Sequence, residues 1–217
     1  MVLGAGFAPS VAHANGRYPS TNSFFFSPTE PDRILLRVTF GLLVSTDRGK
    51  SWDWVCEPAL RISGEEDPMY TITPSGAVVS STYHGVDVST DRLCTFPVVG
   101  APLGPRVFVD LTSRPAAPAE VVVFASARSG EGVYDSELFE TKDEAKSFTS
   151  LGTPFPTTAF LGETVDIAPS DPERIYVSCF IGDPAHAIPK DTESAGIWTE
   201  LFTAAGVSVD RADVDTE

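Results

Sequence analysis

Three adjacent carboxylates, Glu65, Glu66 and Asp67, are the first group of side chains in the sequence that could do chemistry. Carboxylates placed together can act as general acid and base in the hydrolysis of a glycosidic bond, or can bind a hard cation. Adjacent carboxylates in a loop are also common as solvated surface groups. The three residues are therefore candidates for ligand binding, and a solvated loop is the alternative.

Four further residues have side chains that suit ligand binding. Tyr83 and His84 are neighbours and could line a sugar or peptide site, although an aromatic pair beside a turn glycine also suits packing. Arg128 could bind a carboxylate, but the serine and glycine that follow it favour an exposed hairpin tip. Glu163 could act as another carboxylate of the same site.

Other catalytic patterns are missing from the sequence. It contains no G-x-S-x-G, no phosphate-binding loop, no C-x-x-C and no H-E-x-x-H. Its three histidines, one of them close to the N-terminus, cannot build a standard zinc site unaided. We therefore expect no catalytic residue, no metal and no cofactor.

The charge of the chain limits its partners. Thirty acidic and 15 basic residues give a net charge of −15, which should repel nucleic acids and anionic membrane surfaces. No segment after the N-terminus reaches the ~18 apolar residues that span a bilayer. The expected partner is a protein or carbohydrate ligand, and the acidity itself could serve solubility or an acidic binding face.

An internal repeat indicates the elements that would position these candidates. Residues 26–35 (FSPTEPDRIL) and 167–176 (IAPSDPERIY) are identical or chemically similar at every position. They lie 141 residues apart, which is three times 47. A unit near 47 residues is close in size to a propeller blade of four strands.

A second pattern supports the same unit. Residues 45–52 (STDRGKSW) fit S-x-D-x-G-x-[S/T]-W at every fixed position, and residues 89–96 and 141–148 keep the hydroxyl, the aspartate and the final aromatic but lose the glycine. The residues that define the three copies are Ser45, Asp47, Gly49, Trp52, Ser89, Asp91, Phe96, Thr141, Asp143 and Phe148.

This pattern resembles the Asp-box, or BNR-repeat, propellers, which include sialidases, sortilin-type receptors, xyloglucan hydrolases and photosystem II assembly factors. The resemblance covers roughly residues 22–180. It implies an all-β propeller of four-stranded antiparallel blades, with each box between the third and fourth strands and away from the ligand site. The box aspartates are therefore expected to be structural, because a carboxylate can accept the backbone N–H groups of a tight turn.

The repeats predict about four blades, near residues 22–58, 69–99, 106–152 and 164–200, followed by a disordered or divergent tail over 206–217. We expect an incomplete larger propeller, and a genuine four-bladed ring is the alternative. An incomplete ring would expose a blade face and invite self-association. All seven ligand-binding candidates fall in loops opposite the boxes.

The N-terminus suggests secretion. Residues 1–14 are mostly small and apolar and end in the A-x-A pattern that signal peptidase favours. They are interpreted as the remnant of a signal peptide, with an ordinary flexible N-terminus as the alternative. The mature protein would then be secreted, periplasmic or on the cell surface.

Two of the three cysteines, Cys56 and Cys94, fall in neighbouring outer positions of the predicted blades. In an oxidising compartment a disulfide between them would tie two adjacent blades together. Two independent thiols are the alternative.

The function hypothesis rests on the Asp-box pattern and the secretion signal, and on the absence of catalytic motifs from the sequence. Sialidases carry an aromatic-Arg-x-Pro motif in the first blade, whereas this sequence has Phe26-Ser27-Pro28 without an arginine. The sequence therefore favours a non-catalytic extracytoplasmic propeller that acts as a binding or scaffold module through its loop face. The alternatives are a fragment or remnant of a glycoside hydrolase, sialidase-like or xyloglucanase-like, and an assembly factor for a membrane complex.

Overall fold

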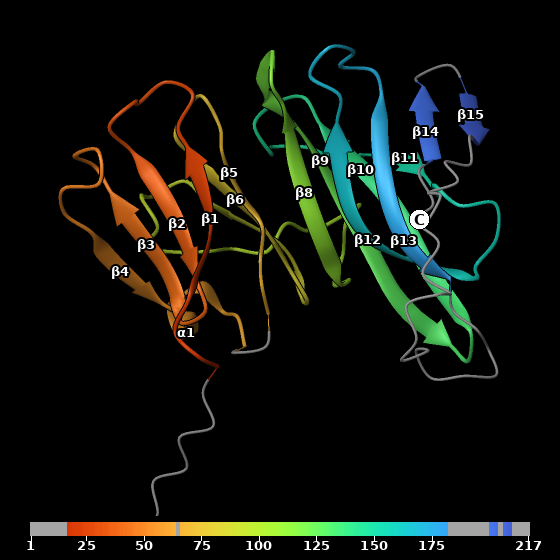
Figure 1. The fold of residues 1–217 in the computed structure, drawn as a ribbon, viewed down its shortest axis with the longest axis horizontal. Coiled ribbons are helices and arrows are strands. Elements are labelled where there is room, and N and C mark those ends of the chain that lie inside the picture. The colour runs from red at the N-terminus through yellow and green to blue at the C-terminus, as the bar shows by residue number, and fades with distance from the viewer. Residues whose placement is uncertain (1–16, 64–65, 182–199, 204–205, 210–217) are drawn as a thin grey trace, which may run out of the picture.

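The computed structural model of the chain describes residues 17–63, 66–181, 200–203 and 206–209. Its strands form four antiparallel sheets, each in chain order. Figure 1 shows the sheets side by side around a common axis, like the blades of a propeller. The predicted all-β propeller is confirmed, and we number the sheets blade one to blade four.

Blade one has the four predicted strands. They are β1 (Thr21–Phe26), β2 (Ile34–Val38), β3 (Gly41–Ser45) and β4 (Asp53–Cys56). A single helical turn, α1 (Glu57–Leu60), follows and buries Leu60 in the interface with blade two. Within the described ranges, no helix is long and apolar enough to cross a membrane.

Blade two differs from the four-stranded prediction. Its sheet contains only three strands, β5 (Tyr70–Ile72), β6 (Val78–Thr82) and β7 (Gly85–Ser89). The segment predicted as its fourth strand, residues 95–99, forms an isolated bridge between Asp87 and Val98. Pro97 explains the difference, because proline has no N–H to contribute to a strand ladder.

Blades three and four complete the fold. Blade three contains β8 (Phe108–Arg114), β9 (Ala117–Gly130), β10 (Val133–Thr141) and β11 (Thr149–Gly152). Blade four contains β12 (Phe160–Ile167), β13 (Ile175–Ile181), β14 (Glu200–Thr203) and β15 (Gly206–Val209). The last strand lies in the segment predicted as a tail, and it is held there by antiparallel pairing with β14.

The hydrophobic core consists of three separate clusters, one between each pair of neighbouring blades. Leu35 of blade one meets Tyr70 of blade two, Val86 meets Phe108 across the next interface, and Phe124 meets Val165 across the third. A closed ring of four blades would need a fourth cluster between blades four and one. The described residues form none, so one face of blade one and one face of blade four remain open.

The three segments that match the Asp-box pattern form the same turn. In the first, the Ser45 hydroxyl donates to Asp47 Oδ1 (2.8 Å) and accepts the Gly49 N–H (2.7 Å). Asp47 also accepts the N–H (2.9 Å) and the hydroxyl (2.6 Å) of Ser51. The other two turns repeat these bonds around Asp91 and Asp143.

The two box turns without glycine keep a left-handed backbone. Leu93 and Ala145 stand where the first box has Gly49, and they have φ values of 72° and 64°. Both side chains are buried in the core. Burial therefore offsets a conformation that glycine adopts more readily.

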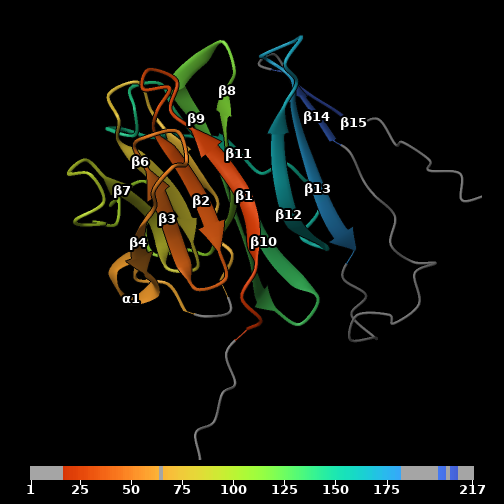
Figure 2. The ribbon, with the colours of Figure 1, turned by 60° about the vertical axis from the view of Figure 1, so that its left-hand side comes forward.

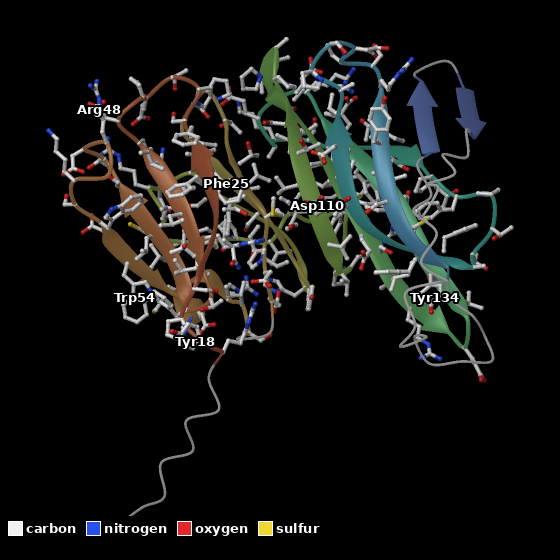
Figure 3. The ribbon with its side chains drawn as sticks, viewed as in Figure 1. Tyr18, Phe25, Arg48, Trp54, Asp110 and Tyr134 are labelled. Carbon is white, nitrogen blue, oxygen red and sulfur yellow. The ribbon has the colours of Figure 1, made fainter. Side chains whose placement is uncertain are left out.

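The two ends of the propeller have different loops. Figure 3 shows Arg48, in the first box turn, at one end, and Tyr18 and Tyr134 at the other. The box turns occupy the first end, which we call the box end. The connections between the second and third strands and between successive blades occupy the second, the loop end.

Candidate functional site

Two cavities lie along the propeller axis. The larger, the central cavity, has a volume of about 590 Å³ and is lined by the innermost strands β1, β5, β8 and β12. The smaller, the channel mouth, has about 330 Å³ and is lined by loop-end residues. Asp67, Val109 and Glu163 line both, so the two cavities adjoin.

Four of the seven ligand-binding candidates meet at the channel mouth. Glu66, Asp67, Tyr83 and Glu163 all line it, although Glu163 is about 80 residues from Tyr83 in the sequence. The loop before β5, the β6–β7 hairpin and strand β12 supply them, so Glu163 lies in a strand rather than in the predicted loop. Glu65 lies outside the described residues.

Glu66 acts mainly as a support for the two loops that carry the site. Its carboxylate accepts the N–H of Ser63 through Oε1 (3.0 Å) and the N–H of Tyr83 through Oε2 (2.9 Å). Glu66 thus joins the loop before β5 to the hairpin between β6 and β7. Both of its oxygens are engaged, so the carboxylate is poorly placed to take a ligand.

Asp67 binds a guanidinium group from the N-terminal segment. Arg17 donates from Nη1 to Oδ1 (3.0 Å) and from Nη2 to Oδ2 (2.8 Å), and Nη1 also approaches the carbonyl of Glu66 (3.4 Å). The hydrogen bonds from Arg17 lower the pKa of Asp67. Both side chains remain partly exposed, at 34% and 42%, so the pair can exchange with other charged groups.

Arg37 of β2 fixes the position of Asp67 through the backbone. Its Nη1 donates to the carbonyl of Asp67 (2.9 Å) and reaches the carbonyl of Pro68 (3.4 Å) and the sulfur of Met69 (3.1 Å). This side chain lines the central cavity. It links blade one to the loop that opens blade two.

Glu163 is the carboxylate at the mouth that has no partner among the described residues. It occupies a bulge in β12, where the pairing with β13 shifts between Gly162 and Thr164. The bulge places the side chain at the junction of the two cavities. Burial raises its pKa, as expected for a carboxylate that is desolvated without a compensating cation.

Asp110, on β8, is a buried carboxyl group that lines the central cavity. Its two oxygens accept the N–H of Leu111 (2.8 Å) and the N–H of Val165 in blade four (2.8 Å). Burial outweighs these bonds and raises its pKa to about 6, and the charge of Asp166 contributes in the same direction. Asp110 therefore links blades three and four and changes charge in mildly acidic conditions.

Two candidates face elsewhere. His84 Nε2 pairs with Oδ2 of the fully buried Asp87 (2.9 Å), and burial raises the pKa of Asp87. Arg128 donates from Nε to the carbonyl of Gly130 (2.8 Å) at the tip of the β9–β10 hairpin. Neither His84 nor Arg128 lines the mouth or the central cavity.

The structure gives a different result for the cysteines. Cys56 and Cys94 are both free thiols, so the predicted disulfide is not formed. Cys56 ends β4 and directly precedes α1, whereas Cys94 lies inside the second box turn, where its N–H donates to Asp91. The two positions belong to different turns rather than to one shared edge. Within the described ranges, no three His, Cys, Asp or Glu side chains are grouped to hold a metal ion.

Sequence reasoning missed Arg17, Arg37 and Asp110. Asp110 was detectable in principle, because it is an acidic residue within the predicted inner strand of the third blade. Arg37 also lies in a predicted strand, between apolar neighbours. Arg17 lies in a segment without periodicity, and no pattern indicated its contact.

Comparisons with known proteins show the fold. No protein-family model and no curated protein matches the sequence. The structure of a GH74 enzyme from Niastella koreensis is 13% identical, with a TM-score of 0.62, over 90% of this chain and 30% of that chain. An ancestral GH74 enzyme is 10% identical, with a TM-score of 0.55, over 97% and 33%.

A third similar structure, from Agrobacterium tumefaciens, is described as a TolB candidate. It is 14% identical, with a TM-score of 0.53, over 89% of this chain and 61% of that one. The chain spans about a third of the length of the two GH74 enzymes. At these identities the likeness establishes the propeller fold and nothing finer.

Proposed function

We propose that this propeller is a non-catalytic extracytoplasmic binding module, and that its channel mouth binds a cationic group such as the arginine side chain of a peptide. The observation that carries the proposal is the bidentate pair between Arg17 and Asp67 at the mouth. The chain's own arginine supports a guanidinium as the group that this carboxylate would bind.

The surroundings of Asp67 support a site rather than an isolated surface ion pair. Arg37 and Glu66 hold the loop in place from two sides. Glu163 supplies a second carboxylate at the same cavity without a partner of its own among the described residues. Tyr83, 52% exposed, offers an aromatic face on which a guanidinium could stack.

The contact of Arg17 also determines how a ligand would bind. Arg17 and an incoming cation would compete for the same two oxygens of Asp67. Partly exposed ion pairs contribute about 0.2–1 kcal/mol, so a ligand can displace the Arg17 side chain from Asp67. Removal of its guanidinium should increase the apparent affinity for a ligand by roughly two- to fivefold.

The test is a calorimetric titration with acetyl-Gly-Arg-Gly-amide, with the citrulline peptide as its uncharged counterpart. We expect binding of the arginine peptide alone, tighter in Arg17→Ala and lost in Asp67→Asn. Glu163→Gln should weaken it. Asp32→Asn is the matched control, because Asp32 pairs with Arg48 at the box end.

Three results would oppose the proposal. Equal binding of the citrulline peptide would show that charge is not recognised. Equal loss in Asp32→Asn would point to a general effect of net charge. If the arginine peptide did not bind to Arg17→Ala even at millimolar concentration, the channel mouth would not be a site for cationic groups.

A glycoside hydrolase fragment is the second candidate, because Asp67 and Glu163 share one cavity and the pKa of Asp110 is raised towards that of a general acid. However, both oxygens of Asp110 are engaged by backbone N–H groups. Release of reducing sugar from xyloglucan by the wild-type chain, abolished in Glu163→Gln, would favour this function over the binding module.

A further inference from the structure

The open face of blade one is an apolar sheet surface. Cross-strand pairing places Phe24, Leu36, Leu43 and Trp54 in one row across the four strands, and Phe26 and Ile34 in the next. We call these six residues the blade-one patch. Figure 2 shows the sheet in front of blade two, with no other described strand over its near side.

Successive residues of β1 show how different the two sides of this blade are. Phe25 points into the core and meets Tyr70 of blade two edge-on, with ring centroids 5.7 Å apart. Phe24 and Phe26, on either side of it, stack against each other at 6.3 Å and remain 57% and 66% exposed. Trp54 is 60% exposed. Three large aromatic rings in one exposed patch are unusual for a surface that faces water alone.

The open face of blade four has a different character. Cross-strand pairs place Thr164 beside Ser178, with their hydroxyls 2.7 Å apart, and Asp166 beside Tyr176. Phe180 is its exposed aromatic residue, at 46%. Contact between this face and the blade-one patch would bury hydroxyls and a carboxylate against aromatic rings, which is costly.

We propose that the blade-one patch is a dimer interface, in which it packs against the same patch of a second copy of this chain. Two arguments select this occupant. The patch contains no acidic or basic residue, so it is a surface on which two chains of net charge −15 can meet without direct repulsion. Pairing with itself matches apolar to apolar, as an isologous interface requires.

Sedimentation velocity of the wild-type chain over a range of concentrations provides the first test. We expect the mass to rise from that of one chain to that of two, and no further. A chain that stays monomeric at 100 μM would overturn the proposal. Growth beyond two copies would also overturn it, since it indicates head-to-tail contact between different faces.

Two matched variants locate the interface. Phe24→Glu should abolish the dimer, because each copy would have to bury an unpaired carboxylate in an apolar interface. Phe180→Glu makes the same change on the open face of blade four and should leave the dimer intact. The reverse pattern would assign the interface to blade four.

Circular dichroism would show whether each variant is folded. If Phe24→Glu does not fold, acrylamide quenching of tryptophan fluorescence in the wild type gives a second measurement. Trp54 should become protected as the protein concentration rises, and Trp54→Phe should remove that change. Quenching that does not depend on concentration would contradict the dimer.

Discussion

The carboxylates at the box end and those along the channel are the same chemical group in opposite situations. Asp47, Asp91 and Asp143 take their hydrogen bonds from residues two to four positions away, and the hydroxyl and N–H that follow each one lower its pKa to about 2. Asp110 is buried and is bonded by a segment far away in the sequence, and its pKa rises; partial burial raises the pKa of the more exposed Glu163 as well. A carboxylate whose hydrogen-bond donors lie nearby in the chain stays ionised and stabilises the fold. A carboxylate buried by distant segments has a raised pKa and can change charge in mildly acidic conditions.

The largest effect expected from this contrast concerns Asp110. Its pKa of about 6 in the fold exceeds the ordinary value of 3.8, so the folded state holds the proton more tightly than the unfolded chain. Its contribution to stability is therefore fully present below pH 4 and is lost as the pH rises through about 6, by roughly 3 kcal/mol. Urea unfolding of the wild type and of Asp110→Asn at pH 4 to 7 should show a steeper loss of stability with rising pH in the wild type than in the variant, which keeps only the contributions of groups such as Asp87 and Glu163.

The box end should show the opposite sign at lower pH. The box aspartates have folded pKa values of about 2, below the ordinary 3.8. Their contribution is present above pH 4 and is lost as the pH falls towards 2. If the free energy of unfolding rose on acidification from pH 4 to 2, the box aspartates would not be ionised groups stabilised by the hydrogen bonds of their neighbours.

Removal of a box hydroxyl is the next largest change. Ser45 is almost fully buried and accepts the N–H of Gly49. Ser45→Ala should lower the free energy of unfolding by about 1–3 kcal/mol, because that N–H loses its acceptor. The midpoint of urea unfolding measures this loss. A change near zero would show that water replaces the hydroxyl.

The box turns that lack glycine allow a finer comparison. Leu93→Gly relieves a left-handed backbone but removes a buried side chain from the core, and we expect a net loss of about 1 kcal/mol. Ala145→Gly relieves similar strain with little burial to lose, and it should change stability by less than about 1 kcal/mol. Thermal unfolding would distinguish the two variants. Equal changes in melting temperature would mean that burial of the Leu93 side chain does not stabilise the second box turn.

The smallest effect on stability is expected at the channel mouth. Arg17→Ala breaks an ion pair that is partly exposed on both sides, and such pairs contribute about 0.2–1 kcal/mol. The free energy of unfolding should therefore barely change, even though ligand binding responds. A loss above 2 kcal/mol would show that Arg17 is part of the fold rather than an occupant of the site.

The sequence predicted the box turns and the blade order well, because both depend on residues close together in the chain. The loss of the fourth strand in blade two was also within reach, since Pro97 stands in the middle of it. The pair between Arg17 and Asp67 was not, because 50 residues separate its members. Loop position indicated Glu66, Asp67, Tyr83 and Glu163, but only the fold showed that they share one cavity.

The bond from Val165 to Asp110 has a consequence for aggregation. Innermost strands have one edge without a neighbouring strand, and such an edge can template the addition of a foreign one. In β12, the N–H groups of Gly162 and Val165 donate instead to the side chains of Ser126 and Asp110 in blade three. These amides should exchange slowly with deuterium although they border a cavity. A foreign strand would have to break both bonds before it could pair there.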